Sequence, residues 1–224
     1  MAARAGDRLT FGEIVEGGGV REQASRVTRD VIRRSNADAA EDARVYLYVI
    51  SCDTCTATKA CCSCVTTAYL HEAIPIAARL VREGRDTPAL RKKLRDAAEK
   101  METTSPDDYT SPCVFLDAAE RCTIYDDRPG VCGTFLVSSP PERCATRGDV
   151  VTIRAPLQDT VPPDLAVRIA LDLGLEPIGT QYAGMMPRMV LLCLEAWPRH
   201  DYVRFLARHG RLAAERFGSR IVPA

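Results

Sequence analysis

The stretch SCDTCTATKACCSC, residues 51–64, holds five of the ten cysteines of this 224-residue chain. Cys52 and Cys55 have the C-x2-C spacing, with which a tight turn aims two thiolates at one ion. Cys61 and Cys62 follow side by side, and Cys64 comes two residues later. A single C-x2-C pair is a weak signal, because redox dithiols share this spacing. The stretch therefore indicates either a metal site or redox chemistry.

A second group of cysteines follows in SPCVFLDAAERCTIYDDRPGVCGTFLVSSPPERC, residues 111–144. Its members are Cys113, Cys122, Cys132 and Cys144. Prolines, aspartates and short apolar pieces alternate here, which predicts irregular chain. A metal bound by both groups would close a long loop and offset the entropy of ordering such a segment.

Composition decides how these thiols are interpreted. Hydrophobic residues make up 46% of the chain, enough for an ordinary core, so disulfides are not needed to staple it. The N-terminus lacks the apolar segment of a secretory signal, and no apolar run reaches the length of a membrane span. We therefore expect a cytoplasmic protein with reduced thiols, where clustered cysteines more often bind metal than form disulfides.

Charge argues against two classes of partner. The chain carries 30 basic and 30 acidic residues, which gives no footprint of nucleic-acid or membrane-surface binding. The expected partners are metal ions, with no nucleic acid and no membrane, and a protein partner is not identified by the sequence.

Hydrophobic periodicity predicts helices on both sides of the cysteines. Apolar residues at helical spacing from Val20 to Val31 predict an amphipathic helix. Residues 43–51 (ARVYLYVIS) suit a short strand, with helix as the alternative. In residues 69–84 we expect a helix that begins near Pro75 and ends at Gly84. The next helix has Thr87 as its N-cap and Pro88 at its first position.

The C-terminal third continues this pattern. Residues 150–156 (VVTIRAP) suit a strand, residues 162–174 predict a helix stopped by Gly174, and two further helices are separated at Pro198. The predicted fold class is mainly α, with an irregular cysteine-rich metal-binding module and at most a few short strands. We expect a single domain over residues 1–224. The module covers about residues 45–147, between an N-terminal helix and C-terminal helices at 160–217.

The order CDTC, KACC, PCVFLD and CTIYDDRPGVCGTF resembles the YkgJ-type cysteine-cluster family. Its domain is described as a zinc- or iron-chelating CxxCxxCC domain, and related clusters occur in flagellin lysine methylases, where iron–sulfur involvement has been suggested. The resemblance runs from about Cys52 to Cys144. It implies metal chelation by Cys52, Cys55, Cys61, Cys62, Cys113, Cys122 and Cys132, with Cys144 as a further ligand.

The chain also departs from this family. The gap between Cys55 and the Cys61–Cys62 pair is longer than in the compact motif, and Cys64 is an extra thiol. Gly133 stands where the family usually has an arginine after the cysteine. These departures bear on which thiols are ligands more than on metal binding itself.

Other residues near the cysteines allow two interpretations. Arg128 either donates to the sulfurs and offsets their charge, or pairs with Asp126 or Asp127 on the surface. We expect Ile124, Tyr125 and Phe135 to form a small apolar floor under the site, joined by Phe115 and Leu116. His71 is interpreted as an ordinary histidine at a helix start, and Cys193, within an apolar helix, as a buried inert thiol.

Three functions remain open on this sequence. The favoured one is a metal-binding protein that chelates zinc or iron through its clustered cysteines, with zinc as the preferred occupant. The second is an iron–sulfur protein that acts in electron transfer or as part of a modifying enzyme. The third is a thiol redox or metal-handling protein. No catalytic residue is assigned.

Overall fold

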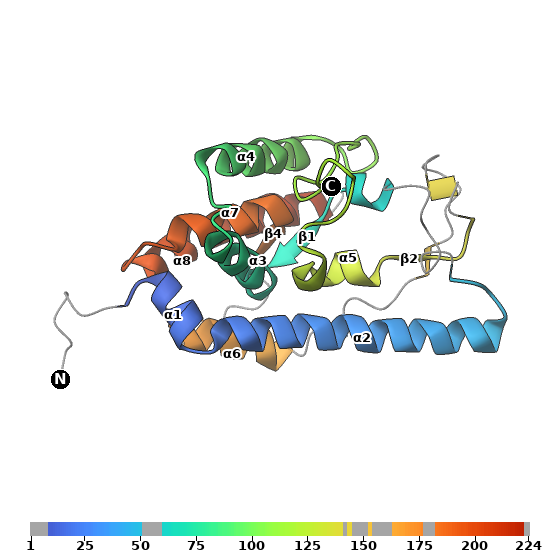
Figure 1. Cartoon of the computed structure of the whole chain (residues 1–224), viewed down its shortest axis with the longest axis horizontal. Coiled ribbons are helices and arrows are strands. Elements are labelled where there is room, and N and C mark those ends of the chain that lie inside the picture. The colour runs from blue at the N-terminus through green and yellow to red at the C-terminus, as the bar shows by residue number, and fades with distance from the viewer. Residues whose placement is uncertain are drawn as a thin grey trace.

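The computed structural model describes residues 9–50, 60–140, 143–144, 152–153, 163–176 and 182–221. It is mainly helical with a few short strands, as the sequence predicted (Figure 1). Its α-helices are α1 (Phe11–Gly17), α2 (Val20–Tyr46), α3 (Leu70–Arg82), α4 (Pro88–Thr103), α5 (Gly130–Thr134), α6 (Pro163–Asp172), α7 (Met186–Ala196) and α8 (Tyr202–Ile221). The short elements are the 3-10 helices η2 (Ala60–Ser63) and η3 (Tyr125–Asp127), and the strands β1 (Thr67–Tyr69), β2 (Leu136–Val137), β3 (Thr152–Ile153) and β4 (Ala183–Met185).

Helix α2 is the longest element and runs along one side of the molecule (Figure 1). The predicted apolar stripe is confirmed, because Val20, Ala24, Val27 and Val31 are all buried. The helix continues to Tyr46, and residues 47–50 form no strand. The strand considered over residues 43–51 is therefore wrong for the described residues 43–50, and the helical alternative is confirmed up to Tyr46. Leu47 ends the helix in the left-handed conformation, at φ 58°.

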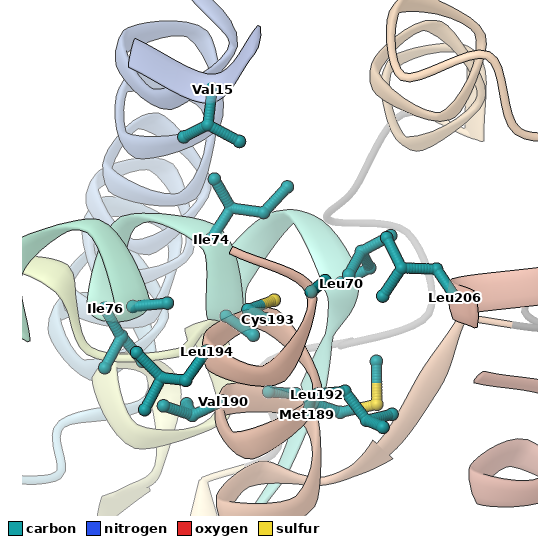
Figure 2. Close-up of a cluster of buried hydrophobic side chains, with 14 of the residues drawn as sticks. Val15, Leu70, Ile74, Ile76, Met189, Val190, Leu192, Cys193, Leu194 and Leu206 are labelled. Atoms are coloured by element: carbon teal, nitrogen blue, oxygen red, sulfur yellow. The ribbon is translucent and has the colours of Figure 1, made fainter. Parts of the chain in front are cut away.

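Helix α7 forms the centre of the core. All of its residues except Arg188 and Glu195 are buried, and α7 contacts α3, α4 and α8. Figure 2 shows Cys193 of this helix among the side chains of Leu70, Ile74 and Leu194. Cys193 is fully buried, as predicted, and burial raises the pKa of its thiol.

The start of α3 differs from the prediction. The helix begins at Leu70 and contains Pro75 in its interior. Two hydrogen bonds hold its first turn: the Glu72 carboxylate accepts the backbone N–H of Tyr69 at 2.8 Å, and the N–H of Leu70 donates to the carbonyl of Tyr182 at 2.7 Å. The predicted end is confirmed, since Arg82 is the last helical residue and Gly84 follows at φ +63°.

Two small antiparallel sheets join distant parts of the chain. In the first, β1 pairs with β4 with Ala68 opposite Gly184, so that α3 and α7 start from neighbouring strands. In the second, β2 pairs with β3, which confirms the strand expected at 150–156 over Thr152–Ile153. Leu136 lies opposite Ile153, directly after the cysteine-bearing helix α5.

The remaining helices agree with the sequence analysis. Thr87 caps α4 by accepting the backbone N–H of Leu90 at 3.2 Å, and Pro88 is its first residue. Gly174 follows α6 at φ +71°, and α7 and α8 are separated around Pro198. Among the described helices, none is both long and apolar enough to cross a membrane.

Candidate metal centre

The predicted ligands lie on several short segments of the module. Cys61 and Cys62 lie in η2, Cys113 and Cys122 in the irregular chain after α4, Cys132 in α5, and Cys144 in the segment 143–144. Cys62, Cys113, Cys122, Cys132 and Cys193 are free thiols. Cys52 and Cys55 lie outside the described residues, so their ligand role stays a prediction.

Backbone hydrogen bonds bring three of these thiols onto neighbouring chain segments. The N–H of Cys113 donates to the carbonyl of Cys62 at 2.7 Å. Cys113 and Cys122 lie on the two arms of a tight turn, which is closed by a bridge between Leu116 and Cys122. The side chain of Asp117 accepts the N–H of Arg121 at 2.9 Å within this turn. Two thiols from the second cysteine group therefore lie beside the end of the first.

The thiols are close enough to affect one another's protonation. The pKa of Cys62 is raised first by a hydrogen bond with the Cys61 thiol, then by burial and by the charges of Cys113 and Cys122. Burial also raises the pKa of Cys113, and Cys122 adds to the effect. The negative charges of neighbouring thiolates repel one another, which keeps the thiols protonated. A bound metal cation offsets these charges, so the thiols can release their protons and become ligands.

Cys132 joins this cluster from α5. The pKa of its thiol is raised to about 12, first by burial and then by the charges of Cys113 and Cys122. The residue is nevertheless exposed to solvent. We call Cys62, Cys113, Cys122 and Cys132 the thiol cluster.

The thiol cluster is not a finished coordination sphere. Within the described residues, no three His, Cys, Asp or Glu side chains are close enough together to hold a metal ion. The donor chemistry nevertheless suits zinc or iron, because thiolates are soft ligands that both accept. Cys61 is exposed beside the cluster, while Cys64 and Cys144 are half-buried, and the ligand roles of Cys61 and Cys144 stay predictions.

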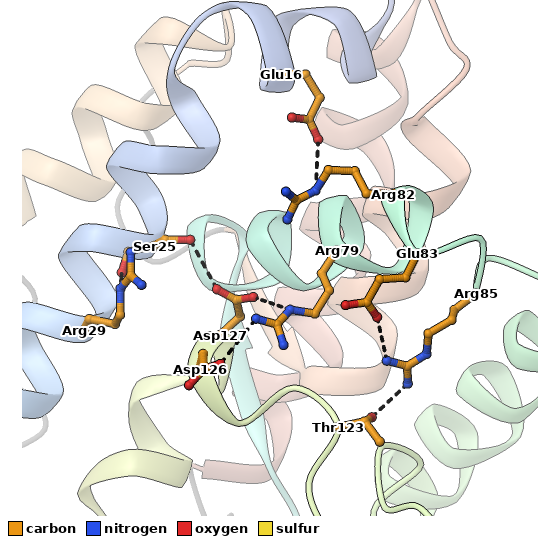
Figure 3. A network of polar contacts seen from close by, with 10 residues as sticks. All are labelled: Glu16, Ser25, Arg29, Arg79, Arg82, Glu83, Arg85, Thr123, Asp126 and Asp127. Carbon is orange, nitrogen blue, oxygen red and sulfur yellow. Dashed lines mark hydrogen bonds and ion pairs between the residues drawn. The ribbon is translucent and has the colours of Figure 1, made fainter.

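A charged network supports the chain between Cys122 and Cys132 (Figure 3). The Asp127 carboxylate lies 2.8 Å from Nε of Arg79 on α3 and accepts a hydrogen bond from Ser25 Oγ on α2 at 3.4 Å. Asp126 lies 3.6 Å from the same guanidinium. The network ties η3 to two long helices, and thereby fixes the chain that connects the two thiols.

This network corrects the surface interpretation of Arg128. Among the described ion pairs, Asp126 and Asp127 pair with Arg79 instead. Arg128 stacks on the ring of Tyr125, 4.1 Å from its centroid. Burial raises the pKa of Cys122, while the charges of Arg128 and Arg79 lower it. Both guanidinium groups therefore favour the thiolate, and direct donation by Arg128 to a sulfur stays a prediction.

The expected apolar floor is only partly correct. Ile124 and Phe115 are buried, at 2% and 1% exposure, and Leu116 is half-buried. The prediction is wrong for Tyr125 and Phe135, because 58% and 43% of their surfaces are exposed. Tyr125 faces Arg128, so its ring stabilises a cation at the surface and does not fill the core.

Sequence reasoning missed two contacts that hold α5. The buried Glu72 carboxylate accepts the N–H of Gly130 at 2.7 Å, across 58 residues of sequence. Gly133 packs against Ile32 of α2, where a Cβ would lie 2.5 Å from Cδ1 of Ile32. The close approach of α2 therefore leaves little room for a side chain at position 133. The only local signal was Glu72 three residues after Tyr69, the spacing of a capping box.

His71 lies in the first turn of α3, as expected for a histidine at a helix start. It is 3% exposed and stacks on Tyr69, with 5.5 Å between the ring centroids. Burial lowers its pKa to about 4, so the ring is neutral at physiological pH. Its Nε2 atom is buried without a hydrogen-bond partner.

A family comparison bears directly on this site. Residues 51–150 match the CxxCxxCC family model. The family is described as a "Putative zinc- or iron-chelating domain", which supports metal binding by this part of the chain and names both metals. The match covers a little less than half of the chain, includes all eight predicted ligands and confirms the resemblance seen in the motifs. Neither a curated protein nor a solved structure matches the chain.

Proposed function

We propose that this chain is a zinc-binding protein whose centre is built on the thiol cluster. The observation that carries the proposal is that backbone contacts join the chain segments of three of these thiols: the N–H of Cys113 donates to the carbonyl of Cys62 at 2.7 Å, and a bridge to Leu116 holds Cys122 beside them. In this proposal Cys62, Cys113, Cys122 and Cys132 are the central ligands. Cys52, Cys55, Cys61 and Cys144 are the further ligands, enough for a second site.

The bound metal would supply a crosslink between irregular segments that have little regular structure of their own. Zinc prefers four ligands in tetrahedral geometry, and all-cysteine zinc sites are usually structural. Four thiolates on one Zn²⁺ leave a net negative charge, which nearby guanidinium groups reduce. Arg79 and Arg128 are placed for this, because both favour the thiolate of Cys122. We assign no reaction to the site, and place it in the cytoplasm because the ligands must stay reduced.

The test is metal analysis of protein purified without air or chelator. We expect about one or two zinc ions per chain and a colourless solution, because the filled d shell of Zn²⁺ allows no d–d absorption of visible light. A brown preparation that bleaches in air would replace zinc by an iron–sulfur cluster. Protein free of any metal would contradict the proposal.

Matched cysteine variants locate the site. Cys122→Ser and Cys132→Ser should each lose bound metal, because each removes a central ligand. Cys193→Ala is the control: its thiol lies in the core within α7, so the variant should keep the full metal content. Loss of metal from Cys193→Ala, with full content in Cys132→Ser, would show that the ligand set is wrong.

A further inference from the structure

A buried carboxylate connects the core to the segment that carries Cys132. Glu72 is 6% exposed and lies in the first turn of α3. Its Oε2 accepts the N–H of Tyr69 at 2.8 Å, and its Oε1 accepts the N–H of Gly130 at 2.7 Å. One side chain thus holds the first turn of α3 and the first residue of α5 at the same time.

The local geometry at Gly130 is shaped by this contact. A Cβ at position 130 would lie 3.0 Å from Oε1 of Glu72, closer than carbon and oxygen normally approach. Glycine therefore lets the backbone reach the carboxylate. Two residues later Cys132 N–H donates to the carbonyl of Pro129 at 3.0 Å, so the position of the thiol depends on where this turn is anchored.

The charge of Glu72 does not assist the thiolates. The carboxylate is one of the groups that raise the pKa of Cys132, after burial and the charges of Cys113 and Cys122. Burial also raises the pKa of Glu72 itself, whereas the hydrogen bonds from the N–H groups of Tyr69 and Gly130 lower it. The support that Glu72 gives to the site is geometric, through the two backbone N–H groups that its carboxylate accepts.

We propose that Glu72 is a positioning residue of the metal centre, which holds Gly130 and thereby places the sulfur of Cys132 with the rest of the thiol cluster. This inference rests on the proposed metal-binding function. Supporting groups of this kind typically change metal affinity by about 10- to 100-fold when removed.

The experiment loads Co²⁺ as the probe into metal-free, reduced protein. Cobalt bound by thiolates absorbs visible light, and the intensity per bound ion grows with the number of thiolate ligands. Glu72→Ala should weaken Co²⁺ binding by about 10- to 100-fold and lower the intensity per bound ion, because Cys132 no longer reaches it. The matched control is Glu102→Ala, which removes another little-exposed carboxylate, paired with Arg188 at 2.9 Å. It should leave the cobalt spectrum unchanged.

A second variant keeps the test decisive if Glu72→Ala fails to fold. Gly130→Ala retains the carboxylate but forces it away from the backbone, so it should change the cobalt spectrum in the same direction. A normal spectrum and affinity in the folded Glu72 variant, or in Gly130→Ala, would overturn the positioning role while leaving metal binding intact. Wild-type protein without cobalt bands would instead overturn the proposed function, and this inference with it.

Discussion

Alanine at position 133 tests how closely α2 covers the cysteine-bearing helix α5. The new Cβ would lie 2.5 Å from Cδ1 of Ile32, 2.6 Å from Cγ1 and 2.8 Å from Cγ2, whereas carbon atoms in contact are about 3.5–4.0 Å apart. Overpacking of this kind typically costs about 1–3 kcal/mol. Alanine also regains about 0.5–1 kcal/mol relative to glycine within a helix. We expect Gly133→Ala to lower the free energy of unfolding by about 1–2 kcal/mol.

The same substitution should change sign when Ile32 is shortened. Ile32→Ala removes the three atoms that the new Cβ would meet, so in that background Gly133→Ala should stabilise the protein by about 0.5–1 kcal/mol. The assay is urea denaturation of the four variants of this cycle in reduced, metal-free form. Equal effects of Gly133→Ala in the two backgrounds would refute the packing argument.

Three further predictions concern other parts of the chain. Leu47 is 91% exposed at φ 58°, so Leu47→Gly should raise the free energy of unfolding by about 1 kcal/mol in urea denaturation, through relief of backbone strain. The folded pKa of His71 is about 4 against an ordinary 6.5. Between these values the unfolded chain binds more protons, so the free energy of unfolding should fall as pH drops from 6.5 to 4, by up to about 1.4 kcal/mol per pH unit. The variant His71→Phe should remove this part of the pH dependence, measured by urea denaturation across the pH range. Asp127→Asn breaks the pair with Arg79 at 2.8 Å and should cost about 1–3 kcal/mol by thermal or urea unfolding, whereas Asp30→Asn, in an exposed helical pair, should cost less than about 0.5 kcal/mol.

Local patterns predicted most of the helices. The stripe from Val20, the cap at Thr87 and the stop at Gly84 each depend on residues within one or two turns, so they can be recognised without the rest of the fold. Pro75 shows where such reasoning fails. Its local penalty predicted a helix start, but the contacts of Tyr69 with Glu72 and of Leu70 with Tyr182 extend the helix by more than a turn.

The chemistry of the candidate site was also visible in the sequence. Clustered cysteines in a chain that needs no disulfides indicate soft metal ligands, and the family match over residues 51–150 supports this. The partners of the charged residues were not visible. Asp126 and Asp127 stand next to Arg128 in sequence, yet they pair with Arg79, because α3 brings the guanidinium of Arg79 beside η3.

The sequence by itself determined the donor type, the two cysteine groups and the helical class, since these follow from residue identity and short-range spacing. Only the tertiary structure decided how the thiols are supported. Glu72 reaches Gly130 across 58 residues, and Ile32 covers Gly133 from a helix that precedes the cysteines altogether. Such contacts depend on how α2, α3 and α5 pack, and packing is a property of the whole buried surface. No local pattern of residues encodes it.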